Sequence, residues 1–210
     1  MRLQLAIDLV DKQGAVKLAT ALKDVIDIAE VGTPIIILEG VHAVEALRQA
    51  QPEMCILADT KIADGASIEA AYACQAGADI ITVLAVSDDL TIKGTIEVAH
   101  AHGKQVLVDL INVPDVITRS RQLDEMGADY LCVHTASDVQ ATGRNPVEQL
   151  RQIKATVKKS RIACAGGINM KTIHEIVAVK PEIVIIGTGI TKAADPYAAA
   201  KAYHDIIARA

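Results

Sequence analysis

Leu57-Ala58-Asp59-Thr60-Lys61-Ile62-Ala63-Asp64-Gly65 places three charged side chains and a glycine directly after the apolar run of residues 54–58. A short apolar run that ends in this way predicts a buried strand with charged groups at its carboxyl end. A charge cluster taken alone is most often a solvated turn. Other predicted strands of this chain end in the same way, which favours a functional site.

Short apolar runs alternate with longer amphipathic ones along the whole chain, and this alternation predicts eight strand–helix units. Ala76-Gly77-Ala78-Asp79 and Met126-Gly127-Ala128-Asp129 lie 50 positions apart and each precede a predicted strand, which suggests a repeated unit of about 25 residues. The predicted strands are residues 3–9, 25–31, 54–58, 80–84, 104–108, 130–133, 161–165 and 183–186. The predicted helices are residues 10–22, 41–51, 67–75, 88–102, 115–125, 145–158, 170–179 and 196–210.

Strict alternation of strands and helices implies a parallel sheet, and eight units imply a closed barrel. No linker or low-complexity segment interrupts the chain, so we expect residues 1–210 to form a single α/β domain, a (β/α)8 TIM barrel. An open doubly wound sheet is the alternative. It is disfavoured because no Gly-x-Gly-x-x-Gly fingerprint follows the first strand.

Composition excludes several classes of protein. The formal net charge is -5 without a basic cluster, which argues against binding to nucleic acid. No apolar run reaches the roughly 18 residues that a membrane span needs. The four cysteines are scattered without metal-binding spacing and follow no secretory signal, so we expect reduced thiols in a cytoplasmic protein. The core must be built from Ala, Val, Ile and Leu, because Phe and Trp are absent.

Acidic side chains gather at one part of the expected carboxyl-terminal rim, where active sites of such barrels lie. The rim residues from strands one, two, three, five and six, with two that follow strand three, are Asp8, Glu30, Asp59, Asp109, His134, Lys61 and Asp64. Glu30 and Asp59 could hold Mg²⁺ through hard oxygen ligands, or could pair with Lys61 or cap helices. His134 is either structural or the proton carrier near pH 7.

Glycines dominate the other part of the rim, after strands seven and eight. They can simply permit tight turns, or their main-chain N–H groups can bind a phosphate, as this position does in such barrels. The candidate phosphate-binding residues are Gly166, Gly167, Gly187, Thr188 and Gly189. Arg144 and Lys192 lie near these loops in sequence and could neutralise the phosphate.

The ordered set of Asp8, Glu30-Val31-Gly32-Thr33, Asp59-x-Lys61-x-x-Asp64 and His134 resembles the orotidine 5′-monophosphate decarboxylase superfamily. The resemblance covers essentially the whole chain. Within the superfamily the chain is similar to the branch that contains 3-hexulose-6-phosphate synthase and 3-keto-L-gulonate-6-phosphate decarboxylase. Four positions depart from the decarboxylase pattern and look like the synthase: Asp109, Ser137, Ala165 and Thr188. Ser137 and Ala165 are therefore the expected specificity positions.

That resemblance implies an aldolase that reversibly condenses formaldehyde with D-ribulose 5-phosphate, giving D-arabino-hex-3-ulose 6-phosphate through a metal-stabilised enediolate. It implies Mg²⁺, with Mn²⁺ possible, held by Glu30 and Asp59, and no organic cofactor. His134 would take the C1 proton and Lys61 would bind the developing oxyanions, while Asp8 and Asp109 would orient hydroxyls and Lys61. Asp64 would enter the neighbouring subunit's site in a homodimer. The alternatives are the decarboxylase and, more remotely, a non-catalytic phosphosugar-binding barrel.

Overall fold

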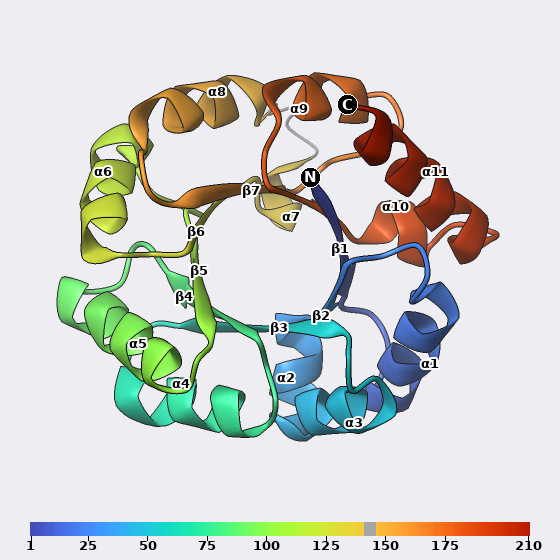
Figure 1. Cartoon of the computed structure of the whole chain (residues 1–210), viewed down its shortest axis with the longest axis horizontal. Helices are drawn as coiled ribbons and strands as arrows, with labels where there is room; N and C mark the ends of the chain where they lie inside the picture. The colour runs from blue at the N-terminus through green and yellow to red at the C-terminus, as the bar shows by residue number, and fades with distance from the viewer. Residues whose placement is uncertain (141–145) are drawn as a thin grey trace.

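The computed structural model describes residues 1–140 and 146–210, apart from the side chains of Ser137 and Gln140. Eight parallel strands close into a barrel in chain order, and the helices form a ring around them (Figure 1). The strands are β1 (Arg2–Ile7), β2 (Ile28–Val31), β3 (Cys55–Ile62), β4 (Ile80–Leu84), β5 (Gln105–Asp109), β6 (Tyr130–His134), β7 (Arg161–Ala165) and β8 (Ile183–Ile186). The predicted (β/α)8 TIM barrel is confirmed.

The helices occupy the connections between strands, and two very short ones, α7 and α10, follow β6 and β8. They are α1 (Lys12–Leu22), α2 (Thr33–Glu39), α3 (His42–Ala50), α4 (Ala66–Gln75), α5 (Asp89–Ala101), α6 (Val116–Met126), α7 (Ser137–Gln140), α8 (Val147–Thr156), α9 (Ile173–Val179), α10 (Thr188–Thr191) and α11 (Pro196–Arg209). Within the described ranges, none of these helices is long and apolar enough to cross a membrane.

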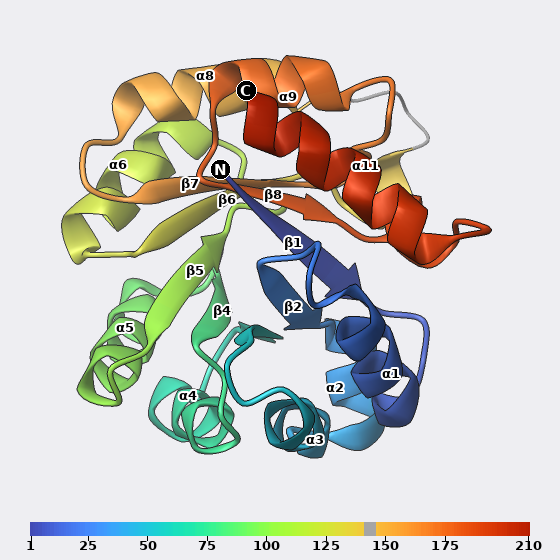
Figure 2. The same cartoon turned by 45° about the vertical axis from the view of Figure 1, so that its right-hand side comes forward.

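Side chains alternate along each strand between two separate cores, because successive residues of a strand point to opposite faces. In β1, Leu3 and Leu5 face outward and pack in the larger core. Figure 2 shows the helices arranged as a layer around the strands. The inward-facing residues form the smaller core inside the barrel, which contains Leu57 and Leu107. The inward positions nearest the carboxyl ends of the strands therefore lie between this smaller core and the carboxyl-terminal rim.

Two local predictions were wrong around β2 and β3. Gly32-Thr33-Pro34 falls between the predicted strand 25–31 and the predicted helix 41–51, where glycine and proline favour a loop. The structure instead begins α2 at Thr33, because proline is compatible with the first turn of a helix. Strand β3 does not end at Ala58 but continues to Ile62 through an irregularity in its pairing with β4. Asp59 and Lys61 therefore belong to the strand itself.

The amino-terminal end of the barrel carries a repeated hydrogen bond. In each case, the acidic residue that immediately precedes an even-numbered strand accepts from the main-chain N–H of the second residue of an odd-numbered strand. The pairs, with N···O distances, are Asp27 with Leu3 (2.7 Å), Asp79 with Ile56 (3.0 Å), Asp129 with Val106 (2.9 Å) and Glu182 with Ile162 (2.7 Å). The repeated pairs Ala78-Asp79 and Ala128-Asp129 thus belong to a set of four equivalent hydrogen bonds.

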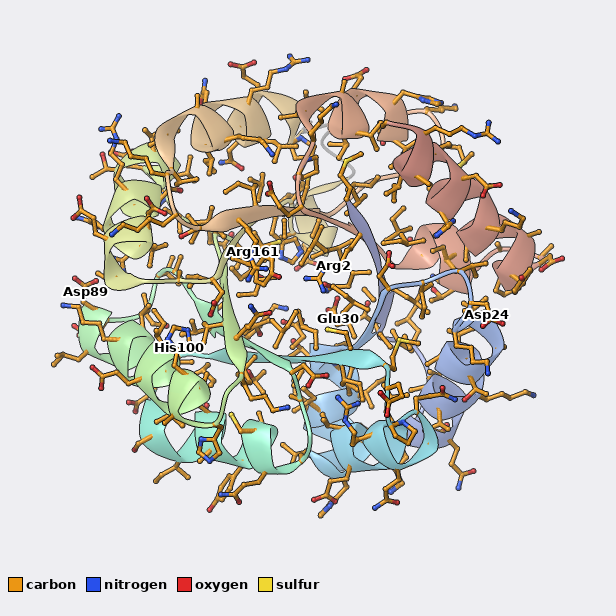
Figure 3. All side chains as sticks on the ribbon, in the orientation of Figure 1. Arg2, Asp24, Glu30, Asp89, His100 and Arg161 are labelled. Carbon is orange, nitrogen blue, oxygen red and sulfur yellow. The ribbon has the colours of Figure 1, made fainter. Side chains whose placement is uncertain are left out.

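Arginine side chains lie inside the ring of strands at this same end, and Figure 3 shows Arg2 and Arg161 there. Arg2 Nη2 donates to the Tyr130 hydroxyl at 2.6 Å, and the Arg161 guanidinium lies 4.0 Å from the centroid of the Tyr130 ring. Stacking of a guanidinium on an aromatic ring is favourable. These contacts cover the smaller core at the amino-terminal end of the barrel.

Candidate active site

A cavity of about 600 Å³ opens at the carboxyl ends of the strands. Its wall contains the inward-facing residues that end β1 to β6 and the loops that follow β7 and β8. It includes these residues predicted from the sequence: Asp8, Glu30, Asp59, Lys61, Asp109, His134, Ala165, Gly166, Gly167, Gly187, Thr188 and Gly189. The expected convergence of polar side chains on one rim is therefore present in the folded chain.

Two other candidates do not join this wall, and two more lie outside the described residues. Asp64 is exposed, and its carboxylate accepts a hydrogen bond from the main-chain N–H of Gly65 at 2.7 Å. Lys192 is also exposed and does not line the cavity. The side chain of Ser137 and all of Arg144 lie outside the described residues.

Among the described hydrogen bonds of the cavity's carboxylates, those of Asp59 are the most numerous. Its Oδ1 accepts from Thr82 Oγ1 at 2.9 Å, and its Oδ2 accepts from Thr33 Oγ1 at 2.8 Å and from the Lys61 ammonium. Thr82 Oγ1 in turn accepts from the main-chain N–H of Lys61 at 2.8 Å, where the Lys61 backbone is left-handed with φ of 46°. Two threonines on neighbouring elements thereby fix both Asp59 and Lys61.

Lys61 carries the positive charge of this wall. Burial lowers its pKa, but the Asp59 carboxylate and, more weakly, Asp109 and Glu30 outweigh burial, so the pKa lies above its ordinary value. The ammonium nitrogen is 3.9 Å from Asp109 Oδ2. Lys61 therefore remains a charged hydrogen-bond donor, which suits binding of a developing oxyanion rather than nucleophilic attack.

The fold disfavours the ionised forms of the Glu30 and Asp8 carboxylates. Glu30 points into the barrel (Figure 3), and the Gln4 amide Nε2 donates to its Oε2 at 2.6 Å. Burial and then the nearby Asp59 charge raise the pKa of Glu30 well above its usual range. Burial and Asp59 also raise the pKa of Asp8. An added cation between these groups would relieve both burial and repulsion.

Asp109 positions His134, a contact that the sequence could not indicate. Asp109 Oδ1 accepts from the main-chain N–H of Ile111 at 3.0 Å, and Asp109 Oδ2 lies 2.8 Å from His134 Nδ1. Because the partner is a carboxylate, we assign the hydrogen to Nδ1. The opposite ring nitrogen, Nε2, is then the basic one, as an acid–base catalyst requires.

The donor set can accommodate a divalent metal ion, although it is incomplete by itself. Among the described residues, no three His, Cys, Asp or Glu side chains form a metal-binding group. Mg²⁺ commonly uses one or two protein carboxylates and completes its shell with substrate and water, and Glu30 and Asp59 fit that use. The described wall carries five carboxylates, including Asp138, against one lysine, so an anionic substrate would need added positive charge.

The glycine part of the wall offers main-chain donors. The N–H groups of Gly167, Thr188 and Gly189 make no hydrogen bond within the described parts of the chain. Gly166 has φ of 89°, and a Cβ atom there would lie 2.1 Å from the Thr135 carbonyl oxygen, so this loop requires glycine. Free N–H groups at this position can bind a phosphate, because they donate without bringing a side chain.

The sequence analysis gave no role in the site to Gln4, Thr82 or Thr33, although it quoted Thr33 within a motif. Gln4 and Thr82 lie within apolar strands at inward positions, and both are buried. Their signal was the period of two, because Gln4, Ala6 and Asp8 share one face of the first strand. Thr33 was part of the quoted motif, but its hydrogen bond to Asp59 was not predicted, since it depends on the unexpected start of α2.

Comparison with known proteins agrees with this geometry. Residues 1–203 match the family described as orotidine 5′-phosphate decarboxylase / HUMPS. The chain belongs to this family. A relative from Staphylococcus saprophyticus, 3-hexulose-6-phosphate synthase 3, is 50% identical over 207 residues, which cover 99% of each chain. The structure of 3-hexulose-6-phosphate synthase from Salmonella typhimurium has 44% identity and a TM-score of 0.97, with 100% of this chain and 99% of that one covered.

A second branch of the orotidine 5′-phosphate decarboxylase / HUMPS family is more distant. The structure of 3-keto-L-gulonate-6-phosphate decarboxylase from Vibrio cholerae is 26% identical, with a TM-score of 0.86 and coverage of 99% of this chain and 97% of that one. The high identity to the synthases over the full length makes this chain an enzyme of the family. The resemblance predicted from the sequence is confirmed.

Proposed function

We propose that this enzyme is an aldehyde-lyase that reversibly condenses formaldehyde with D-ribulose 5-phosphate to give D-arabino-hex-3-ulose 6-phosphate. The observation that carries the proposal is the Asp109–His134 pair, which stands beside buried Glu30 and Asp59 and faces the glycine loops in one cavity. The full-length similarity to proteins named 3-hexulose-6-phosphate synthase supports it. A location in the cytoplasm is part of the same proposal.

The sugar phosphate would bind with its phosphate at the main-chain N–H groups of Gly167, Thr188 and Gly189. His134 Nε2 would then take a proton from C1. The electrons of that C–H bond form the C1–C2 double bond, and the C2 carbonyl oxygen takes the negative charge. Lys61 would donate a hydrogen bond to that oxygen, while Asp109 would stabilise the protonated imidazole.

Formaldehyde is the second reactant and enters in the condensation step. The C2 oxyanion re-forms the C2 carbonyl, the electrons of the C1–C2 double bond form the new bond from C1 to the formaldehyde carbon, and the carbonyl π electrons move to the aldehyde oxygen, which takes the proton from His134. Asp8 and the glycine loops would keep the sugar chain in position. Glu30 and Asp59 would hold Mg²⁺, or Mn²⁺ in its place, which would supply positive charge to substrate oxygens as negative charge develops.

Asp64 belongs to the proposal through a homodimer with shared active sites. Within one chain it is exposed and away from the cavity. The following helix α4 also exposes Ile68 and Tyr72, at 57% and 56%, and α2 exposes Ile37 at 80%. These exposed apolar side chains on α4 and α2 support contact with a second copy, because such side chains are usually covered in an assembly.

Decarboxylation of 3-keto-L-gulonate 6-phosphate is the second candidate reaction, since the Vibrio cholerae decarboxylase has the same fold over nearly the whole chain. Asp109, Ala165 and Thr188 all line the cavity and differ from the pattern expected of the decarboxylase branch. Both reactions pass through an enediolate, so a slow side reaction with the acid is expected.

The test measures formaldehyde consumption with ribulose 5-phosphate, with Mg²⁺ and with EDTA, beside CO₂ release from 3-keto-L-gulonate 6-phosphate. We expect fast loss of formaldehyde that EDTA stops, and much slower CO₂ release. Faster CO₂ release would assign the enzyme to the decarboxylase reaction. Absence of both activities would leave a phosphosugar-binding barrel.

A further inference from the structure

A second, smaller cavity of about 250 Å³ lies next to the active-site cavity. His134, Ile111 and Ala136 line both, so His134 stands in the wall between them. The smaller cavity is built from the loop after β5, the segment after β6 and the first turn of α8. It therefore reaches the catalytic histidine from a side that the carboxylates do not occupy.

The described lining of the two cavities differs in charge. The larger cavity has five carboxylates and a lysine, whereas the smaller one has no Asp, Glu, Lys or Arg among its described lining residues. Its polar side chains include the amides of Asn112 and Gln149, and its apolar ones include Val113 and Val139. Neither amide makes a hydrogen bond to another described residue. Such a lining suits a small uncharged molecule with a carbonyl or hydroxyl oxygen.

Asp109 connects this lining to the catalytic histidine. Its Oδ1 holds the main-chain N–H of Ile111, and the Val113 N–H donates to the Leu110 carbonyl at 3.2 Å, which closes a tight turn. Asn112 occupies that turn with φ of 60°, a conformation that asparagine tolerates better than most residues. One carboxylate thus fixes both the imidazole and the turn that presents Asn112.

We propose that the smaller cavity is the access route and binding site of the uncharged aldehyde substrate, with Asn112 and Gln149 as its hydrogen-bonding residues. This inference rests on the proposed function, because it assigns the second reactant of that reaction. The larger cavity would hold the sugar phosphate, and the smaller cavity shares His134 with it, so a molecule in the smaller cavity lies close to the residue that acts on C1. Its uncharged described lining suits a molecule as small as formaldehyde or its hydrate.

The decisive experiment removes the amides without touching His134. Asn112→Gly keeps a residue that accepts the left-handed turn, and Gln149→Leu keeps the size of the side chain. For each variant we expect a rise of about three- to tenfold in the KM for formaldehyde, the effect of one lost hydrogen bond. The KM for ribulose 5-phosphate and the rate of deuterium uptake at its C1 in D₂O without formaldehyde should stay unchanged.

Gln152→Leu is the matched control, because Gln152 is an exposed glutamine on the same helix that bonds Glu148 instead. It should leave all three quantities unchanged. Thermal melting checks that each variant folds. If one of the two cavity variants does not fold, the other is enough for the test. An unaltered formaldehyde KM with normal deuterium uptake overturns the inference alone. A parent enzyme that neither consumes formaldehyde nor exchanges the C1 proton overturns the proposed function and the inference with it.

Discussion

The two ends of the barrel use carboxylates in opposite ways. At the amino-terminal end, four acids each accept a main-chain N–H from a neighbouring strand. At the carboxyl-terminal end, Asp109 also accepts a main-chain N–H, but the acids beside it depend on side-chain donors or, for Asp8, have no hydrogen bond to any described residue. The acids of the first group bond neighbouring strands to each other. Those of the second group keep their charge available for a ligand.

The pKa of Asp79 contrasts with those of Glu30 and Asp8. Burial raises the pKa of Asp79, but hydrogen bonds from Lys104 and the Ile56 main chain outweigh it, and the pKa lies below its ordinary value. Burial and Asp59 raise the pKa of both Glu30 and Asp8. Ionised Asp79 therefore stabilises the fold, whereas ionised Glu30 and Asp8 destabilise it until a cation or substrate arrives. Ionised Asp79 thus adds stability, whereas ionised Glu30 and Asp8 reduce it at the end that carries the site.

The largest expected effect separates two histidines that each contact an aspartate. His134 lies 2.8 Å from Asp109 at the carboxyl-terminal end, and His100 lies 2.8 Å from Asp129 at the amino-terminal end. His134→Ala should lower the rate of aldehyde condensation by about 10²- to 10⁴-fold, the usual contribution of a general base. His100→Ala should leave turnover unchanged. If steady-state assays showed equal losses of condensation rate for the two variants, the two ends of the barrel would not differ in function.

The second effect concerns Glu30 and the proposed metal ion. The folded pKa of Glu30 lies above the unfolded value of about 4.3, so above that pH ionisation of Glu30 opposes folding. Glu30→Gln should therefore melt at a higher temperature than the parent in EDTA at pH 7. Adding Mg²⁺ at 100 times its dissociation constant should stabilise the parent by about 3 kcal/mol and the variant far less.

Differential scanning calorimetry with and without Mg²⁺ makes this measurement without an activity assay. Glu182→Gln at the amino-terminal end is the matched control, because Glu182 bonds the Ile162 main chain and lies away from the cavity. It should lower the melting temperature and leave the Mg²⁺ response intact. A Glu30→Gln variant with the full Mg²⁺ response would exclude Glu30 as a ligand.

The barrel and most of the site were predictable because their signals are local. Glu30, Asp59 and His134 follow or end apolar runs of strand length, and parallel strands bring such ends to one rim. The extent of β3 was not predictable, since Thr60 and Lys61 resemble a loop and stay in the strand through contacts to Thr82.

Contacts between distant residues supply what remained hidden. Asp109 and His134 are 25 positions apart, and their bond depends on β5 and β6 being neighbours in the barrel. Gln4 and Thr82 lie in apolar strands, and their role in the site cannot be predicted until it is known which face of each strand points inward. The smaller cavity requires the loop after β5, the segment after β6 and the first turn of α8 to meet, so no single stretch of sequence predicts it.

The smallest expected effect tests the amino-terminal carboxylates through pH. Because the folded pKa of Asp79 is depressed, its stabilising contribution is present above the unfolded pKa of about 3.9 and disappears as pH falls through the folded value. Asp79→Ala should therefore unfold at a lower denaturant concentration than the parent at pH 7, and the gap should narrow toward pH 3. Asp8→Ala should show the opposite sign at pH 7, since burial and Asp59 disfavour its charge. Urea titrations at both pH values would decide, and an equal loss of stability for the two variants at pH 7 would mean that the two ends do not differ in how they hold charge.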